Sequence, residues 1–326
     1  MALERARRHG RNLGAGTPGG EPATIRLPRS GPVASRPLQP LITAIGRVLL
    51  GKEQAVQLAL ACLLARGHLL IEDLPGMGKT TLAEALARGF GLSFKRVSFT
   101  SDLLPADLTG INVFDAANTR FHFQPGPLFS QVLLADEINR ASPRTQSALL
   151  EAMAAGRVSV DGVSHPLPQP FLVIATQNGI DQVGTAPLPE SQLDRFLMRL
   201  SLGFPNREAE RALLGGAALP PASLEPFCDA TGLLELQRQA ATQHCSTALL
   251  DYVLDLAAFS RRADQPGPGL SPRACQGLVA AARAWSLLEG RDHVTPADVQ
   301  AVLPAVADHR LQRDAAALLA GVDGLR

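Results

Sequence analysis

The chain has 326 residues, which suits two domains of ordinary size, and 46% of them are hydrophobic, enough to build a core in each. Its 31 basic and 30 acidic residues nearly cancel, which argues against a strongly basic nucleic-acid binder. The sequence has no apolar run long enough for a membrane span, no apolar stretch behind its N-terminal arginines and no CxxC pair among its four cysteines. It therefore predicts a cytoplasmic protein without a membrane span, a secretory signal, a disulfide framework or a zinc knuckle.

Residues 1–36 differ in composition from the rest of the chain. They contain seven arginines and two glutamates, a formal charge of +5, so that the remainder carries about −4 of the total of +1. Glycines and four prolines interrupt this stretch, and almost nothing in it is apolar, which predicts a disordered basic tail. Such an arm could contact nucleic acid or an anionic lipid surface, although a solvated tail is the simpler interpretation.

Residues 37–205 combine helical periodicity with short apolar runs. Apolar residues spaced as on one helical face predict helices at 38–49 and 53–65. The elements expected next are strand 68–72, helix 80–88, strands 94–99 and 132–135, helix 143–155, and strands 171–176 and 196–202. Buried strands joined by helical crossovers predict an α/β core with a mostly parallel five-stranded sheet covered on both faces. Insertions at 112–123 and 156–165 alternate apolar and polar residues around a turn and predict hairpins.

Residues 206–326 are almost entirely helix-periodic and predict a small all-α domain. Two of its helix starts are clearly marked. Ser271 and Thr295 each place a capping hydroxyl before a proline at the first helical position, and Asp298 follows Thr295 at the third.

The strongest chemical signal is a glycine-rich segment between the strand at 68–72 and the following helix. Backbone N–H groups of such a turn can surround a polyphosphate. Lys79 is expected to reach the β- and γ-phosphates, and the Thr80 hydroxyl to ligate Mg²⁺. The generic motif has glycine six residues before the lysine, where this chain has an aspartate. The predicted nucleotide-binding residues are Asp73, Leu74, Pro75, Gly76, Met77, Gly78, Lys79, Thr80 and Thr81.

A second signal is the apolar run 132–135 followed by two carboxylates, Asp136 and Glu137. A strand of an α/β sheet delivers such residues at its C-terminal end, where these sheets place their ligands. Asp136 is expected to hold Mg²⁺, and Glu137 to polarise the attacking water. By itself an apolar run before Asp-Glu is a weak signal, and the phosphate loop upstream strengthens it.

Four segments extend these signals and resemble the MoxR family of AAA+ ATPases: Asp136-Glu-Ile-Asn-Arg-Ala141, Gln146-Ser-Ala-Leu-Leu-Glu-Ala-Met153, Ile174-Ala-Thr-Gln-Asn178 and Pro187-Leu-Pro-Glu-Ser-Gln-Leu-Asp-Arg-Phe196. The resemblance runs from about residue 37 to residue 313. It explains Asp73, because Glu-Asp-x-Pro-Gly-x-Gly-Lys-Thr is common in that family. It implies an AAA+ P-loop αβα core followed by an all-α lid, with ATP and Mg²⁺ as cofactors.

The resemblance also implies roles for three further residues. Asn178 matches the sensor that orients water against the γ-phosphate, although an asparagine in a turn before Gly179 is the simpler alternative. Arg195 matches the arginine finger that is donated to the neighbouring subunit's nucleotide, and an ion pair within the chain, with Asp194 or a nearby acid, is its alternative. Arg273 matches the second sensor, which reaches the phosphates from the lid. The two hairpins resemble insertions thought to contact substrates or partners, and solvated hairpins are the default alternative.

The function implied is ATP hydrolysis by a homo-oligomeric, hexameric ring that remodels or matures a client protein. Relatives are thought to work with a von Willebrand factor A (VWA) domain partner and, in some cases, in metal insertion. One alternative is an ATP-gated binding scaffold with little hydrolysis, and the filled catalytic positions argue against it. A nucleic-acid motor is a second alternative, and an aromatic content of 4% with an acidic body argues against strand binding.

Overall fold

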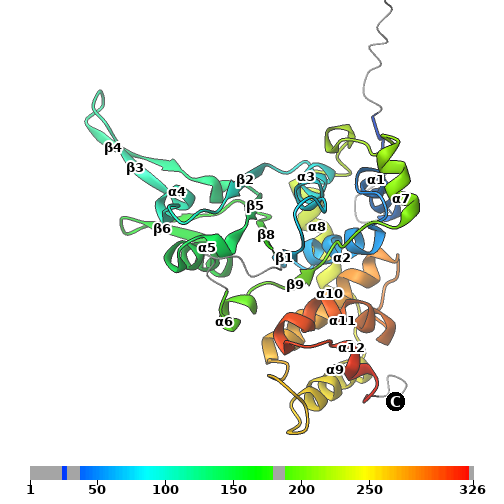
Figure 1. The fold of residues 1–326 in the computed structure, drawn as a ribbon. Coiled ribbons are helices and arrows are strands. Elements are labelled where there is room, and N and C mark those ends of the chain that lie inside the picture. Colours follow the sequence, from blue (N-terminus) through cyan, green and yellow to red (C-terminus); the bar gives the residue numbers. More distant parts are fainter. Residues whose placement is uncertain (1–23, 28–36, 179–187, 323–326) are drawn as a thin grey trace, which may run out of the picture.

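The computed structural model describes residues 24–27, 37–178 and 188–322 (Figure 1). One sheet is built from β1 (Leu69–Glu72), β2 (Phe94–Ser98), β5 (Val132–Asp136), β8 (Leu172–Gln177) and β9 (Met198–Leu200). Its order is β2-β5-β8-β1-β9, and every neighbouring pair is parallel. The prediction of a parallel five-stranded sheet is confirmed.

Helices cover both faces of this sheet because its central strands are apolar on both sides. In β5, for example, Leu134 faces one core and Leu133 faces the other. The first core is shared with α1 (Gln39–Val48), α2 (Glu53–Leu64) and α3 (Lys79–Gly89). The second is shared with α4 (Pro105–Thr109) and α5 (Pro143–Ala155). This is the predicted α/β core with helices on either side.

The register of the sheet brings several strand ends to one edge. Glu72 at the end of β1 pairs with Gln177 at the end of β8, and Ala135 of β5 pairs with Ala175 of β8. Residues that follow β1, β5 and β8 therefore emerge side by side, at the edge where parallel sheets place their ligands.

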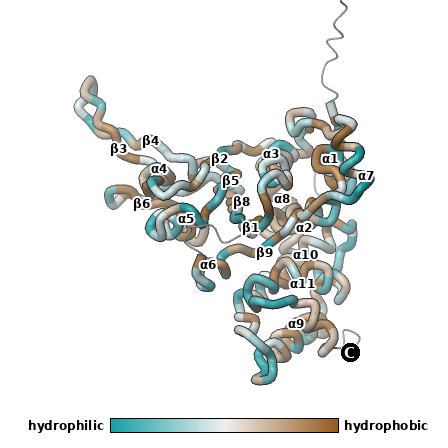
Figure 2. Tube along the Cα trace, viewed as in Figure 1, coloured by the Kyte–Doolittle hydropathy of each residue, from teal (hydrophilic) through white to brown (hydrophobic). Residues whose placement is uncertain are grey.

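The C-terminal part is helical, as predicted. It contains α7 (Arg207–Leu214), α8 (Ala230–Ala241), α9 (Thr247–Ser260), α10 (Pro272–Leu288), α11 (Pro296–Leu311) and α12 (Ala316–Leu319). The first turns of α7 are hydrophilic (Figure 2), and Ala209 is its buried residue, packed over Gly51. Both predicted helix starts are correct, because the Ser271 hydroxyl accepts from Ala274 N–H and Asp298 accepts from Thr295 N–H.

The helical part shares its hydrophobic core with α1, α2 and α3. The α10 helix packs against α2 and α11, and α11 packs against β9. A hydrogen bond from the Gln237 side chain to the Leu63 carbonyl, 2.8 Å long, joins α8 to α2. The lid helices are thus held on the sheet side that carries α2, next to the edge strand β9.

Both insertions are hairpins, as predicted. The first pairs β3 (Gly110–Asp115) with β4 (Arg120–Pro125), and the second pairs β6 (Arg157–Val160) with β7 (Val163–Pro166). Figure 1 shows the β3–β4 hairpin extending away from the sheet. Its Phe114 and Phe121 rings contact each other, 5.2 Å between centroids, and both are exposed.

Part of the predicted disordered tail is ordered. Ile25 and Leu27 are buried, and the Ile25 N–H donates to the Ser223 carbonyl while the Ile25 carbonyl accepts from Glu225 N–H. The prediction is wrong for residues 24–27 because two apolar side chains find a core there despite their Arg- and Pro-rich surroundings. The rest of the predicted tail lies outside the described residues. Along the described part of the chain, no helix is both long and apolar enough to cross a membrane.

Candidate active site

The loop between β1 and α3 adopts a conformation that depends on its glycines. Gly76 and Gly78 have φ values of +83° and +94°, in the left-handed region that side chains disfavour. A Cβ at Gly78 would also lie 2.7 Å from the Leu49 Cδ1 atom. The α3 helix begins at Lys79 with no acidic side chain in its first turn, so the N–H groups at this helix start are suited to an anion.

Asp73 anchors this loop to the segment after β9. Its carboxylate accepts hydrogen bonds from the Ser201 hydroxyl at 2.9 Å, from Gly203 N–H at 3.2 Å and from Leu202 N–H. Glycine, the generic residue at this position, has no side chain to make these bonds. The departure from the generic motif therefore has a structural purpose, which is to fix the start of the loop.

Lys79 lies at the centre of the site. Its Nζ donates to the Asp73 carbonyl at 2.6 Å and to Asn178 Oδ1 at 3.2 Å. Burial lowers the pKa of Lys79, and the nearby Asp73, Asp136 and Glu137 carboxylates oppose that shift. The ammonium group is thus held by neutral oxygens in a place where a more negative ligand could replace them.

Asp136 ends β5 and is held from two sides. Its Oδ1 accepts from the Thr176 hydroxyl at 2.6 Å, and its Oδ2 accepts from Arg96 Nε at 3.2 Å. The same Thr176 oxygen accepts from Glu137 N–H at 2.9 Å, so one β8 side chain positions both acidic residues.

Glu137 has a φ of +56°, which is uncommon for a residue with a side chain and turns its carboxylate toward β8. Its Oε1 accepts from Asn178 Nδ2 at 3.0 Å, and its Oε2 accepts from Arg140 Nη1 at 2.7 Å. Lys79, Asn178 and Glu137 are therefore connected by hydrogen bonds.

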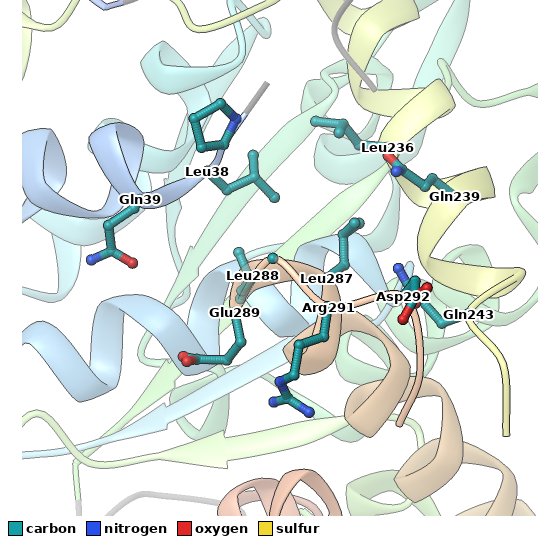
Figure 3. A pocket seen from close by; sticks show the side chains of 12 residues that line it. Leu38, Gln39, Leu236, Gln239, Gln243, Leu287, Leu288, Glu289, Arg291 and Asp292 are labelled. Carbon is teal, nitrogen blue, oxygen red and sulfur yellow. The ribbon is translucent and has the colours of Figure 1, made fainter. Parts of the chain in front are cut away.

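These side chains surround a cavity of about 380 Å³. It is lined by Pro75, Gly76, Gly78, Lys79, Thr80, Thr81, Arg96, Asp136, Glu137 and Asn178. Of the predicted loop residues, Asp73, Leu74 and Met77 lie in the loop but do not line the cavity. A larger cavity, of about 730 Å³, lies away from this loop, between the start of α1, α8 and the end of α10 (Figure 3).

Arg96 and Arg140 were not predicted. Arg96 is on β2, two residues before Ser98, which pairs with Asp136 in the sheet. A basic residue near the end of the strand next to β5 is a signal that could have identified it, but only with the strand order known. Arg140 lies three residues after Glu137, and this i, i+3 spacing could have suggested the pair.

Arg195 and Arg273 lie elsewhere. Among the described residues, neither lines the cavity around Lys79. Arg195 Nη1 donates to the Leu150 carbonyl at 3.1 Å, and Asp194 is paired with Arg310 at 2.7 Å and with Arg273 at 3.8 Å. The alternative of an Asp194–Arg195 ion pair therefore does not describe this structure. Arg273, at the start of α10, lies beside Asp194 and has a largely exposed side chain.

The parallel sheet of this order, the phosphate loop, the paired carboxylates at the end of β5 and the helical lid define the class as an AAA+ ATPase. The family model described as "ATPase family associated with various cellular activities (AAA)" matches residues 68–198, and the model "AAA lid domain" matches residues 256–322.

Similar proteins specify the family further. Protein YeaC of Bacillus subtilis is 43% identical over 280 residues, which cover 85% of this chain and 88% of YeaC. Chaperone MoxR1 of Mycobacterium tuberculosis is 41% identical, covering 84% of this chain and 75% of MoxR1. The crystal structure of a protein from Cytophaga hutchinsonii, assigned as an ATPase, is 33% identical and superimposes with a TM-score of 0.76, covering 84% of this chain and 86% of that one. The chain belongs to the MoxR family of AAA+ ATPases.

Proposed function

We propose that this protein binds ATP with Mg²⁺ at the Lys79 cavity and hydrolyses it to ADP and phosphate, working as a hexameric ring on a client protein. The observation that supports the chemistry most directly is the hydrogen-bonded series Lys79–Asn178–Glu137 at the mouth of a glycine-rich loop. In the proposed reaction the Lys79 ammonium would bind phosphate, the Asn178 amide would orient water and the Glu137 carboxylate would act as the base.

The residues present fit a magnesium ion. The Thr80 hydroxyl and the Asp136 carboxylate both line the cavity, and oxygen atoms of this kind are the ligands that Mg²⁺ prefers. Thr80 and Asp136 would hold the ion, which when bound would neutralise charge on the phosphate oxygens. Arg96 now occupies one Asp136 oxygen, so its guanidinium would give way or turn toward phosphate.

The catalytic steps then follow from the positions of the side chains. Lys79 exchanges its bonds to Asp73 and Asn178 for bonds to phosphate oxygens. Glu137, released from Arg140, takes a proton from the attacking water, and the freed Asn178 amide orients that water. Because a neutral amide adds no charge, it can position the water without repelling or neutralising the phosphate.

Arg195 and Arg273 support a site shared between subunits. Neither lines the cavity of its own chain, and both lie at Asp194 or directly beside it. Arginine in trans is an efficient way to stabilise the charge that develops in phosphoryl transfer. We assign both to the nucleotide of a neighbouring subunit, with Arg195 as the finger, so that oligomerisation completes the catalytic set.

The proposal that the protein acts on a client protein rests on its similarity to a named chaperone and on the exposed hairpins. The M. tuberculosis relative is named a chaperone. The exposed Phe114–Phe121 pair on β3–β4 could contact an apolar segment of a client or of a VWA-domain partner. Remodelling such a protein, in metal insertion for instance, would use the motion of the lid against the core during turnover.

The test is ATP turnover and ATP binding by Glu137→Gln beside the wild-type chain. The variant keeps the shape of Glu137 and removes its basicity, so turnover should fall by about 100-fold or more while ATP still binds. Glu151→Gln, an exposed position on α5, is the matched control and should hydrolyse ATP normally. Tight ATP binding with no turnover that depends on Glu137 would instead favour the ATP-gated scaffold.

A further inference from the structure

The buried Arg310 on α11 makes an unusually complete set of hydrogen bonds. Its side chain is 7% exposed. Nε donates to Asp194 Oδ1 at 2.7 Å, Nη2 donates to the Asp194 and Phe196 carbonyls at 3.2 and 2.8 Å, and Nη1 donates to the Leu197 carbonyl at 3.1 Å. A further bond joins Nη1 to the Val306 carbonyl on the same helix.

These acceptors bracket Arg195. Arg310 binds the carbonyls of the residues immediately before and after Arg195, and it binds the side chain of the first of them. A guanidinium with five donors in a fixed plane can hold several acceptors in one geometry, which no other side chain does. The backbone that carries Arg195 is therefore fixed from the lid side by one residue.

Neighbouring contacts hold the same segment from other directions. The His309 ring Nε2 lies 3.2 Å from the Phe196 carbonyl, and the Phe196 side chain is fully buried in the core beside α5. Leu197 packs over Gly67 and Gly277, where a Cβ would lie 2.3 and 2.9 Å from its atoms. Within the described part of the chain, by contrast, the Arg195 side chain donates one hydrogen bond, to the Leu150 carbonyl. Among the described residues, the backbone of this segment therefore has several partners and the Arg195 side chain has one.

The free-energy cost of burying the Arg310 guanidinium indicates that Arg310 does more than stabilise the fold. Burying a guanidinium is unfavourable unless its charge and all its donors are satisfied, and an apolar side chain of similar size often serves stability equally well. Burial lowers the pKa of Arg310, and the Asp194 carboxylate opposes that shift. A polar clamp of this kind specifies one conformation of the segment it binds.

We propose that Arg310 is the positioning residue for Arg195: it sets the backbone on which the finger is presented to the neighbouring subunit, and it couples that backbone to the lid helix α11. This inference rests on the proposed function, because it needs a finger that acts in trans. Since α11 also packs on α10, which begins at Pro272 and carries Arg273, a movement of the lid would displace both arginines together. The nucleotide state of one subunit could in this way reach the catalytic site of the next.

The test is subunit complementation with full-length chains. Arg310→Met alone should lower kcat about 100-fold, with its ATP affinity within about twofold of wild type, because a misplaced finger damages only the neighbour's site. Mixed with Lys79→Ala, whose finger is intact, Arg310→Met should recover turnover at its own site. Mixed with Arg195→Ala it should not recover, because neither chain then supplies a working finger.

Arg291→Met is the matched control. Arg291 binds the buried Asp298 at the start of α11 and lines the cavity in Figure 3, so its loss disturbs the same helix without touching the Arg195 segment. It should hydrolyse ATP within about twofold of wild type per folded chain, since no catalytic group moves. If Arg310→Met does not fold, Arg310→Lys, which keeps the charge but cannot reach all the acceptors, should give the same pattern.

Each outcome decides between the claims. Three results would overturn the role of Arg310. The first is full turnover of Arg310→Met alone, and the second is recovery of turnover when Arg310→Met is mixed with Arg195→Ala. The third is no recovery when Arg310→Met is mixed with Lys79→Ala, under conditions where Arg195→Ala and Lys79→Ala do complement each other. Failure of Arg195→Ala and Lys79→Ala to complement each other would overturn the shared site itself, and with it this inference.

Discussion

At the scale of single residues, Gly78 shows how closely the phosphate loop depends on its backbone. Its φ of +94° disfavours any side chain, and a Cβ at this position would lie only 2.7 Å from the Leu49 Cδ1 atom. Gly78→Ala should therefore distort the start of α3 and weaken ATP binding by about tenfold or more, as an equilibrium titration would measure.

Gly216→Ala separates loop distortion from backbone strain. Gly216 has a similar φ of +72°, but nothing lies within 4 Å of its Cβ position, and it follows α7 rather than β1. The positive φ alone should lower the free energy of unfolding by roughly 1 kcal/mol in each variant. Equal ATP affinity of Gly78→Ala and Gly216→Ala would contradict the role given to the loop.

Site residues that belong to a sequence motif were easier to predict than residues that reach the site only through the tertiary fold. Lys79, Asp136, Glu137 and Asn178 each lie at or beyond the C-terminal end of a strand, and parallel strands end at one edge, so their meeting could be expected. Arg96 could not, because its approach to Asp136 depends on β2 lying next to β5. Arg310 is still harder to foresee, since its partners at 194–197 lie more than a hundred residues away.

At the scale of elements, the His68 side chain, directly before β1, links that strand to β8. Its Nδ1 accepts from the Val173 N–H at 3.0 Å, and its Nε2 lies 3.3 Å from the Met153 carbonyl, which suits a neutral ring that donates from Nε2. Protonation of Nδ1 would set two N–H groups against each other. Desolvation accordingly lowers the pKa of His68 to about 4, from an ordinary value of 6.5.

Because the pKa of His68 is lower in the folded chain than in the unfolded chain, the stability of the fold depends on pH. Between pH 6.5 and 4 the unfolded chain binds the proton more readily than the folded one, so the stabilisation is complete above pH 6.5 and is lost as the pH falls toward 4. The free energy of unfolding should drop by about 2 kcal/mol from this residue between about pH 7.5 and about pH 5. His68→Gln should reduce that drop in urea unfolding measured at both pH values, whereas an unchanged pH dependence would show that His68 does not titrate in this way.

Elements with a strong periodic pattern were predictable, and short ones were not. The hairpins β3–β4 and β6–β7 and the proline-started helices α10 and α11 follow local rules of alternation and capping. The short helices α4 and α6 (Glu190–Leu193) have too few residues for a period to be visible. The order at residues 24–27 depends on a partner segment near Leu224 that the local sequence does not indicate.

At the scale of the whole molecule, the helical lid and the sheet do not pack as independent bodies. The lid helices share a core with α2, and the α11 helix holds the segment from Asp194 to Leu197. The cavity around Lys79 and the surface that carries Arg195 and Arg273 are therefore connected through packed elements of one chain. This connection supports the proposal that each chain completes its neighbour's site.

The central claim is that the active site is completed by a second copy of the chain. Steady-state ATP turnover per chain, measured across a range of protein concentrations with Glu137→Gln as the blank, tests it most directly. Turnover per chain should rise with concentration as chains assemble and then level off when assembly is complete. Turnover that is sensitive to Glu137 yet constant per chain down to concentrations at which the protein is monomeric would contradict the account.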